Sequence, residues 1–336
     1  MSSENPIEVA VIGVGAFGRN HARVYHELML EGVPVRLAAV VDQDTARADE
    51  IARQYGARAF GSVEQMIETR GEIQAASVTV PTIHHLKVAR ILMEAGVDVL
   101  IEKPLAVSLN EADDLVAIAK NSGRIAQVGH LERFNPAVRA TLPYLTRPMF
   151  FEVHRLSVFT PRSLDVDVVL DLMIHDLDIV LAFVNSPVKE IRAVGLPILS
   201  GKVDIANVRM EFESGCVANL TASRVSTERV RKLRFFQPGQ YISIDYGRQD
   251  VLVFSVGANK KDGEQPSINP QIGVAKPTVV AQEPLRAELK AFLDSVARRT
   301  QPLVSLEEGR RALALALDVV RTIEEHASNV QLHRLT

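Results

Sequence analysis

The 336-residue chain is poor in cysteine, has no long apolar run and carries little net charge. Its single cysteine, Cys216, excludes an internal disulfide, which fits a reducing cytoplasm as the location. No uninterrupted stretch of about 18 apolar residues is present, so we expect no membrane-spanning helix. The segment MSSENPIEVA lacks a charged region followed by an apolar core, so we expect no secretory signal. The formal net charge of −3 provides no attraction to nucleic acid or to anionic membranes.

The order of apolar segments predicts two domains of different type. From residue 7 to about residue 128, short apolar runs alternate with longer amphipathic stretches, which is typical of a doubly wound parallel sheet. Beyond that point strand-like segments follow one another, interrupted by one helix over residues 166–184, and two helices close the chain. We therefore expect an α/β chain with a Rossmann domain over residues 1–128. An α+β domain with a large, mostly antiparallel open sheet should occupy residues 129–336.

The stretch VIGVGAFGRNHA contains the pattern G-x-G-x-x-G at Gly13, Gly15 and Gly18. Alone the pattern is equally consistent with a plain turn, but here it follows a strand and opens a helix, as the dinucleotide-binding motif requires. Such glycines permit a tight turn, close approach of a pyrophosphate and close packing of helix on strand. The free N–H groups at the helix N-terminus then face the phosphates. The sequence therefore predicts a dinucleotide site.

The next strand-like segment ends in a carboxylate, Asp42. At this position a carboxylate accepts hydrogen bonds from the adenosine ribose hydroxyls and repels a 2′-phosphate. This favours NAD over NADP as the cofactor. Arg47 and Arg53 follow closely in the sequence and are candidates for contacts with a phosphate, so NADP stays as the alternative.

Two further segments carry groups suited to proton transfer. Lys103, in Glu102-Lys103-Pro104, ends an apolar strand, and ligands of open α/β sheets bind beyond the carboxyl ends of strands. Asp171 and His175 are four residues apart on a predicted helix and so share a face, where the carboxylate can orient the imidazole as a general base. The alternatives are a solvated lysine, and a surface pair or a metal site on the helix. No second histidine stands at ligand spacing, so we expect no metal.

Taken together, GVGAFG, Asp42, VPTIHH, EKP and D-x-x-x-H occur in an order that resembles the glucose–fructose oxidoreductase/inositol dehydrogenase/MocA family of NAD(P)-dependent sugar oxidoreductases. The resemblance covers essentially the whole chain and implies an N-terminal Rossmann domain. It also implies a C-terminal sheet through which members associate as homodimers or homotetramers. It assigns the reaction centre to Lys103, Asp171 and His175. The cofactor positions that it implies are Gly13, Gly15, Ala16, Phe17, Gly18, Asp42, Pro81, His85, Glu102 and Lys103.

One family pattern, T-P-N-x-x-H after the fourth strand, is only partly met. Pro81 and His85 match it, whereas Val80 replaces the threonine and Thr82 replaces the asparagine. Because these positions lie near the nicotinamide in the family, the change is expected to retune contacts and to leave the site in place.

A finer resemblance comes from GHLERFNPAV, residues 129–138, with DVDVVLDLMIHDLDIVL, residues 165–181. These segments are similar to the branch that oxidises the 3-hydroxyl of UDP-N-acetylglucosamine, whose 3-keto product a PLP aminotransferase converts to a 3-amino sugar. The alternatives are a dehydrogenase of a free sugar or inositol, and a non-catalytic dinucleotide-binding sensor or regulator. A sugar nucleotide requires cations at its diphosphate and polar groups at its sugar. The candidates in the sequence are Arg133, Arg155, Arg162, Arg224 and Arg231 for the diphosphate, and His130 and Asn135 for the sugar.

Overall fold

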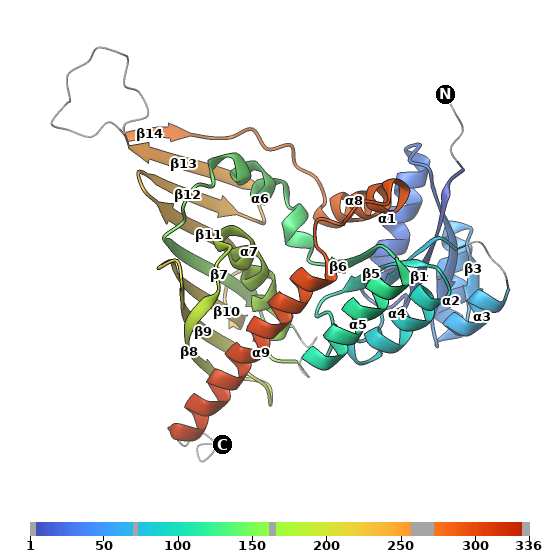
Figure 1. Ribbon diagram of the computed structural model, residues 1–336, viewed down its shortest axis with the longest axis horizontal. Helices are drawn as coiled ribbons and strands as arrows, with labels where there is room; N and C mark the ends of the chain where they lie inside the picture. The colour runs from blue at the N-terminus through green and yellow to red at the C-terminus, as the bar shows by residue number, and fades with distance from the viewer. Residues whose placement is uncertain (1–4, 70–72, 161–165, 257–271, 331–336) are drawn as a thin grey trace, which may run out of the picture. The chain divides into compact units, whose positions relative to one another are not determined.

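The computed structural model describes residues 5–69, 73–160, 166–256 and 272–330 (Figure 1). The chain divides into two compact units. The first comprises Met1–Leu131 with Glu283–Leu313, and the second comprises Glu132–Gln282 with Ala314–Thr336. In the described part of the chain, no helix has the length and apolar character needed to cross a membrane.

The first unit contains a six-stranded parallel sheet in the order β3-β2-β1-β4-β5-β6. This is the strand order of a dinucleotide-binding Rossmann sheet, with the reversal of order between β1 and β4. Its strands are β1 (Ile7–Ile12), β2 (Val35–Val41), β3 (Arg58–Phe60), β4 (Ala75–Val78), β5 (Asp98–Glu102) and β6 (Ala126–Gly129). Its helices are α1 (Gly18–Leu30), α2 (Thr45–Tyr55), α3 (Val63–Glu68), α4 (His85–Glu94), α5 (Leu109–Ser122), α8 (Pro284–Arg298) and the start of α9 (Leu306–Asn329).

Local sequence signals explain where several of these helices begin and end. The hydroxyl of Ser62 accepts a hydrogen bond from the N–H of Gln65 at the start of α3, and Ser108 accepts from Glu111 at the start of α5. Gly56 ends α2 in the left-handed conformation, with φ of 70°. The strand and helix alternation predicted for this unit is therefore confirmed.

Helix α8 packs in the first unit, although the sequence placed residues 129–336 together in a second domain. Leu285, Leu289 and Phe292 are buried in one apolar core with Val9 and Val11 of β1. The spacing of these α8 residues forms a single apolar stripe, and it is the α1 side of the parallel sheet that buries this stripe. The division by residues thus differs from the predicted one in that Glu283–Leu313 belongs with the first unit.

The second unit contains an eight-stranded sheet in the order β14-β13-β12-β11-β7-β10-β9-β8. Neighbouring strands are antiparallel except for β7 and β10, which are parallel. The strands are β7 (Phe150–Val158), β8 (Val188–Leu196), β9 (Ile205–Phe212), β10 (Val217–Ser226), β11 (Val230–Gln237), β12 (Gln240–Asp245), β13 (Asp250–Val256) and β14 (Ile272–Ala275). The predicted large, mostly antiparallel sheet is confirmed.

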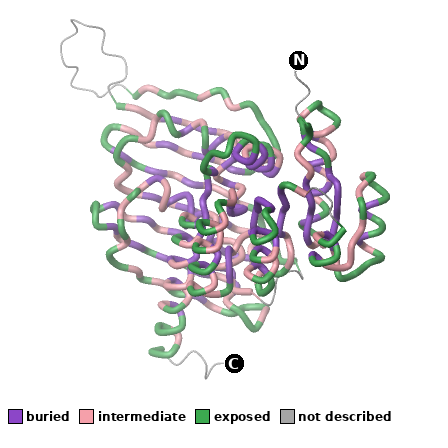
Figure 2. The backbone as a smooth tube through the Cα atoms, turned by 45° about the vertical axis from the view of Figure 1, so that its right-hand side comes forward, coloured by how far each residue is buried: buried purple, intermediate pink, exposed green. Residues whose placement is uncertain are grey.

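Helices α6 (Pro136–Thr141) and α7 (Ile174–Val184) cover one face of this sheet (Figure 1). Phe151, Phe183 and Phe235 form an aromatic cluster between α7 and the sheet, with ring centroids 5.6–6.4 Å apart. Figure 2 shows buried residues alternating with less buried ones along these strands. The strands therefore have one packed face and one open face.

Candidate active site

The glycine-rich loop between β1 and α1 needs its three glycines for different reasons. Gly13 has a φ of 89°, and a Cβ there would lie 2.9 Å from the backbone nitrogen of Val80. A Cβ on Gly18 would overlap the carbonyl oxygen of Gly13 and lie 2.6 Å from the Thr79 hydroxyl, which donates to the same carbonyl at 2.6 Å. A Cβ on Gly15 would meet no atom within 4 Å. The fold therefore requires Gly13 and Gly18, whereas Gly15 leaves open the space that a pyrophosphate needs.

Asp42 follows β2 and is tied to this loop. Its Oδ2 accepts a hydrogen bond from the N–H of Val14 at 2.9 Å, and its Oδ1 accepts from the N–H of Asp44 at 2.9 Å. The guanidinium of Arg47 also lies against this carboxylate, 3.3 Å from both oxygens. Arg53 donates instead to the carbonyl oxygen of Asp49 in its own helix. Of the two predicted candidates for a phosphate contact, the structure thus brings Arg47 to Asp42.

The loops after β4 and β5 are joined by His85. Pro81 precedes a 3₁₀ turn over Thr82–His84, and the buried imidazole of His85 at its end faces two carbonyl oxygens. Its Nε2 lies 3.0 Å from the oxygen of Val80 and its Nδ1 lies 3.2 Å from that of Leu105. Burial lowers the pKa of His85. Through these two contacts, His85 holds the loops after β4 and β5 together. Its direct contact with the cofactor stays a prediction.

Glu102 and Lys103 lie where β5 ends, as the sequence predicts. The carboxylate of Glu102 is largely buried, contacts Nε2 of His21 at 3.1 Å and accepts a hydrogen bond from the N–H of Lys103 at 3.3 Å. His21 belongs to α1, one turn after Gly18, and sequence reasoning missed it. The signal that identifies His21 in the sequence is its place as a polar residue on the apolar face of an amphipathic helix. Glu102 therefore links the helix of the glycine loop to the backbone of the candidate catalytic lysine.

In the second unit, the predicted helix over residues 166–184 begins with a π-helical turn, Val169–Met173, before α7. The N–H of Ile174 donates to the carbonyl oxygen of Val169, which is the i→i+5 bond of such a turn. Asp171 lies in the turn and His175 in the first turn of α7. Both side chains are half-buried, while Met173 and Ile174 between them are buried in the core. Wide turns of this kind are frequent at functional sites, which strengthens the assignment of this segment.

Arg155 of β7 is the centre of a buried ion network. Its guanidinium binds the carboxylate of Asp176 with two hydrogen bonds, of 2.6 and 2.9 Å, and donates a third to Glu132 at 3.1 Å. The ring of Tyr246 lies 5.1 Å from its central carbon. Burial raises the pKa of Asp176, and the charge of Arg155 opposes this shift. These bonds tie Arg155 to α7 at Asp176, the residue adjacent to His175, and a contact of Arg155 with a diphosphate stays a prediction.

Asn135 and Arg224, which are also predicted to contact the substrate, form hydrogen bonds within the fold. Asn135 is buried, caps α6 by accepting from the N–H of Ala137 at 3.0 Å, and donates to Glu132 and to the carbonyl oxygen of Tyr246. Arg224 is buried and donates to two carbonyl oxygens, those of Val166 and Val203. Arg224 also lies 3.4 Å from Asp204 in an ion pair. Buried polar groups need such partners within the protein, and contacts of Asn135 and Arg224 with the substrate stay predictions.

The remaining residues predicted to bind the substrate differ in their burial and in their charged neighbours. Arg133 lies 3.4 Å from Asp178 and is largely buried, and His130 is buried at the end of β6. Arg162 lies outside the described residues. Arg231 of β11 stands directly opposite Arg155 in the strand register and is half-buried. Burial, and secondly the charge of Arg155, lower the pKa of Arg231. A half-buried cation beside another cation is a suitable ligand for an anion.

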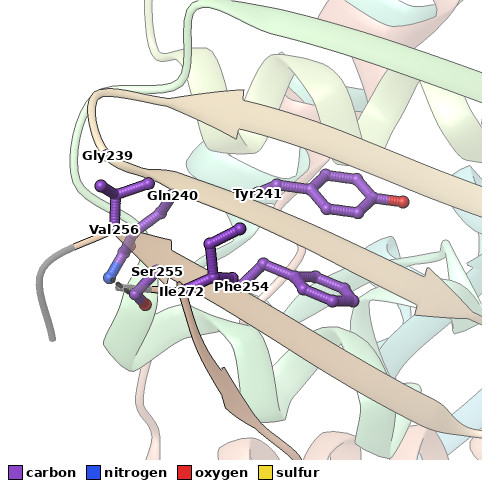
Figure 3. A pocket seen from close by; sticks show the side chains of 7 residues that line it. All are labelled: Gly239, Gln240, Tyr241, Phe254, Ser255, Val256 and Ile272. Atoms are coloured by element: carbon purple, nitrogen blue, oxygen red, sulfur yellow. Dashed lines mark hydrogen bonds between the residues drawn. The ribbon is translucent and has the colours of Figure 1, made fainter. Parts of the chain in front are cut away.

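The open face of the large sheet carries a ladder of aromatic residues across adjacent strands. Phe150, Phe236, Tyr241 and Phe254 follow one another at centroid distances of 5.6, 4.8 and 5.2 Å. Figure 3 shows Tyr241 and Phe254 side by side beside an open pocket whose lining includes Ile272 of β14. Ile272 is 68% exposed. This aromatic ladder, together with Ile272, forms an apolar surface on one face of the sheet.

Comparisons with known proteins agree with this architecture. The family model described as "Oxidoreductase family, NAD-binding Rossmann fold" matches residues 7–130, and that of the "GFO/IDH/MocA C-terminal domain" matches residues 144–237. UDP-N-acetylglucosamine 3-dehydrogenase of Acidithiobacillus ferrooxidans is 36% identical over 323 residues, which cover 95% of this chain and 97% of that protein. Myo-inositol 2-dehydrogenase of Thermotoga maritima is 24% identical over 339 residues, 96% of this chain and 98% of that protein.

A solved structure of the Acidithiobacillus ferrooxidans enzyme has a TM-score of 0.86 and 35% identity, covering 96% of this chain and 99% of that one. Levoglucosan dehydrogenase in complex with NADH has a TM-score of 0.83 at 16% identity, which shows a common fold. Both family models match in the order that the two units require, and together they span more than half of the chain. The chain therefore belongs to the GFO/IDH/MocA family of oxidoreductases, with an NAD-binding Rossmann fold at its N-terminus.

Proposed function

We propose that this NAD-dependent oxidoreductase oxidises the 3-hydroxyl of UDP-N-acetylglucosamine to the 3-keto sugar nucleotide. The observation that carries the proposal is the 36% identity, over nearly the full length of both chains, to an enzyme with that name. Named inositol dehydrogenases match at lower identity, 27% over 66% of this chain in the case of scyllo-inositol 2-dehydrogenase of Bacillus subtilis. The keto product is chemically suited to an aminotransferase that makes a 3-amino sugar. The single, buried Cys216 fits an enzyme that works in the reducing cytoplasm.

The glycine loop, Asp42 and the β5 end provide the residues that would hold NAD. When bound, NAD supplies the hydride acceptor. The chain itself must take up the proton of the sugar hydroxyl, and Lys103 and His175 are the two groups proposed for this step. Asp171, four residues before His175, would orient the imidazole and stabilise its protonated form. The buried pair of Arg155 and Asp176 supports this role, because it anchors α7 at the residue adjacent to His175.

Arg231 is the proposed ligand of the diphosphate. Arg155 and Arg224 donate hydrogen bonds within the fold, whereas the side chain of Arg231 makes no hydrogen bond or ion pair with the described residues. Its position opposite Arg155 places it on the helix-covered face of the sheet, the same face that α7 packs against. A guanidinium presents a planar fork that matches phosphate oxygens.

The oligomer is proposed to be a homodimer or homotetramer that forms through the aromatic ladder. The partner that fits this surface is a second copy of the same chain. The surface is apolar, exposed and on the open face of a sheet, and interfaces between identical chains are commonly apolar surfaces of this kind. The strand edge at β14 adds Ile272 and Val274, which are 68% and 61% exposed.

A substrate panel tests the proposed reaction. Purified protein is mixed with NAD and, separately, with UDP-N-acetylglucosamine, N-acetylglucosamine, myo-inositol and scyllo-inositol, and NADH formation is followed by absorbance. We expect turnover with the sugar nucleotide alone. Turnover of an inositol without turnover of UDP-N-acetylglucosamine would replace the proposal with the polyol reaction. NADH binding without turnover of any compound would favour a non-catalytic sensor.

A further inference from the structure

Two carboxylates follow β2, those of Asp42 and Asp44, and their contacts suggest a role for Asp44 in the choice of cofactor. Asp42 and Asp44 both contact the guanidinium of Arg47, with distances of 3.3 Å to Asp42 and 2.9 Å to Asp44. Asp42 is the carboxylate placed to read the adenosine ribose. A phosphate on the 2′-hydroxyl would therefore arrive within reach of Arg47.

Arg47 by itself would favour NADP, since arginine is the residue that binds a 2′-phosphate in Rossmann domains. Here it is held by two carboxylates, so the three side chains together carry a charge of −1. Asp42 cannot be released easily, because its two oxygens also accept the N–H groups of Val14 and Asp44. Asp44 is different, since its side chain is 48% exposed and, within the part of the chain that the structure describes, binds only the backbone N–H and the guanidinium of Arg47.

We propose that Asp44 is a specificity-determining residue, which keeps Arg47 in an ion pair and so denies a 2′-phosphate its cation. Asp44 acts through Arg47 and is thus a positioning residue. It sets the preference for NAD over NADP, independently of which sugar the enzyme oxidises.

Asp44 also caps α2, because its Oδ1 accepts the N–H of Arg47 at 3.1 Å. Asparagine caps helices as well as aspartate does, so Asp44→Asn removes the charge and keeps the cap. Asp44→Ser is the second variant, which also retains a capping oxygen. The matched control is Asp49→Asn, which removes one carboxylate from the exposed surface of the same helix.

The experiment measures dissociation constants of NADPH and NADH for the purified full-length protein by the fluorescence of the reduced nicotinamide. We expect Asp44→Asn to tighten NADPH binding at least about tenfold, while NADH binding changes by less than about twofold. Ten-fold corresponds to about 1.4 kcal/mol. The double variant Asp44→Asn/Arg47→Gln should lose the gain, because Arg47 is then absent.

Three results would overturn the proposal: an unchanged NADPH to NADH ratio in both Asp44 variants, an equal gain in Asp49→Asn, or a gain that survives the loss of Arg47. The second of these would mean that general surface charge sets the ratio. Circular dichroism of each variant checks that α2 and the fold are retained. A loss of binding is then due to the substitution and not to unfolding.

Discussion

Glu288 of α8 carries a carboxyl group, and its neighbours in the helix are buried apolar side chains. It is fully buried, and neither of its carboxyl oxygens has a hydrogen-bond partner among the described residues. Leu285 and Phe292, about one turn away in α8, and Leu289, the next residue, all belong to the core. Burial raises the pKa of Glu288 well above its ordinary value, and the charge of Glu102 raises it further. The folded protein therefore holds a proton on Glu288 at pH values where the unfolded chain releases it.

This difference makes stability depend on pH. A carboxyl group whose pKa is raised by folding contributes its full stability below the ordinary pKa, and this contribution is lost as pH rises toward the folded pKa. The slope is at most about 1.4 kcal/mol per pH unit, since one proton is released on unfolding. Between pH 5 and pH 7 the loss reaches at most about 2.7 kcal/mol.

Glu288→Gln removes this dependence, because the amide has nearly the same shape and does not titrate. We expect the difference in free energy of unfolding, variant minus wild type, to rise steadily from pH 5 to pH 7 in favour of the variant. The measurement is urea unfolding followed by circular dichroism at several pH values. Glu50→Gln, at an exposed position of α2, is the control for the loss of one carboxylate. A difference that is constant from pH 5 to pH 7 would refute the reasoning, because it would mean that folding does not change the protonation of Glu288.

The remaining predictions concern the reaction, the substrate and the oligomer. Lys103→Ala and His175→Ala should each reduce kcat by about 10²–10⁴-fold, as loss of a general base does, with the dissociation constant of NADH nearly unchanged in a fluorescence titration; full turnover in both variants would contradict their assignment. Arg231→Gln should raise the KM for UDP-N-acetylglucosamine by about 10- to 100-fold and weaken inhibition by UDP, since a hydrogen bond to a charged group contributes about 1.5–3 kcal/mol; an unchanged KM would assign the diphosphate to another cation. Tyr241→Lys should reduce the mass measured by light scattering toward that of one chain, whereas Leu30→Lys, at an exposed position of α1, should not; an unchanged mass for Tyr241→Lys would exclude the aromatic ladder as the interface.

Interactions between neighbours in the chain were predictable from the sequence. Gly13 and Gly18 follow from the need for a tight turn, and Ser62 and Ser108 follow from the need to cap a helix within the next three residues. Parallel strands and an open antiparallel sheet follow from the spacing of apolar runs. Each of these signals, a turn motif, a capping residue or the period of apolar residues, extends over a few neighbouring residues, so the local pattern is sufficient to predict the feature, even where distant contacts such as those of Val80 and Thr79 with the glycine loop add to it.

The tasks of the polar side chains in the second unit could not be predicted in this way. Arg155 has the residue type for a diphosphate, yet Asp176, Glu132 and Tyr246 come from three other segments of the chain to surround it. Asn135 similarly serves a helix cap and two buried acceptors. A sequence shows which donors exist, but only the packing of distant segments decides which of them must be satisfied inside the protein.

The sequence by itself determined the fold class, the family resemblance and the position of the cofactor loop, because these depend on periodicity and on short motifs. Tertiary structure decided that α8 belongs to the Rossmann unit, that the N–H of Val14 holds Asp42, and that Glu288 is buried with no hydrogen-bond partner among the described residues. The physical reason is the same in all three cases. The burial and the hydrogen bonding of these groups depend on contacts between residues far apart in the chain, and those contacts exist only once the chain has folded.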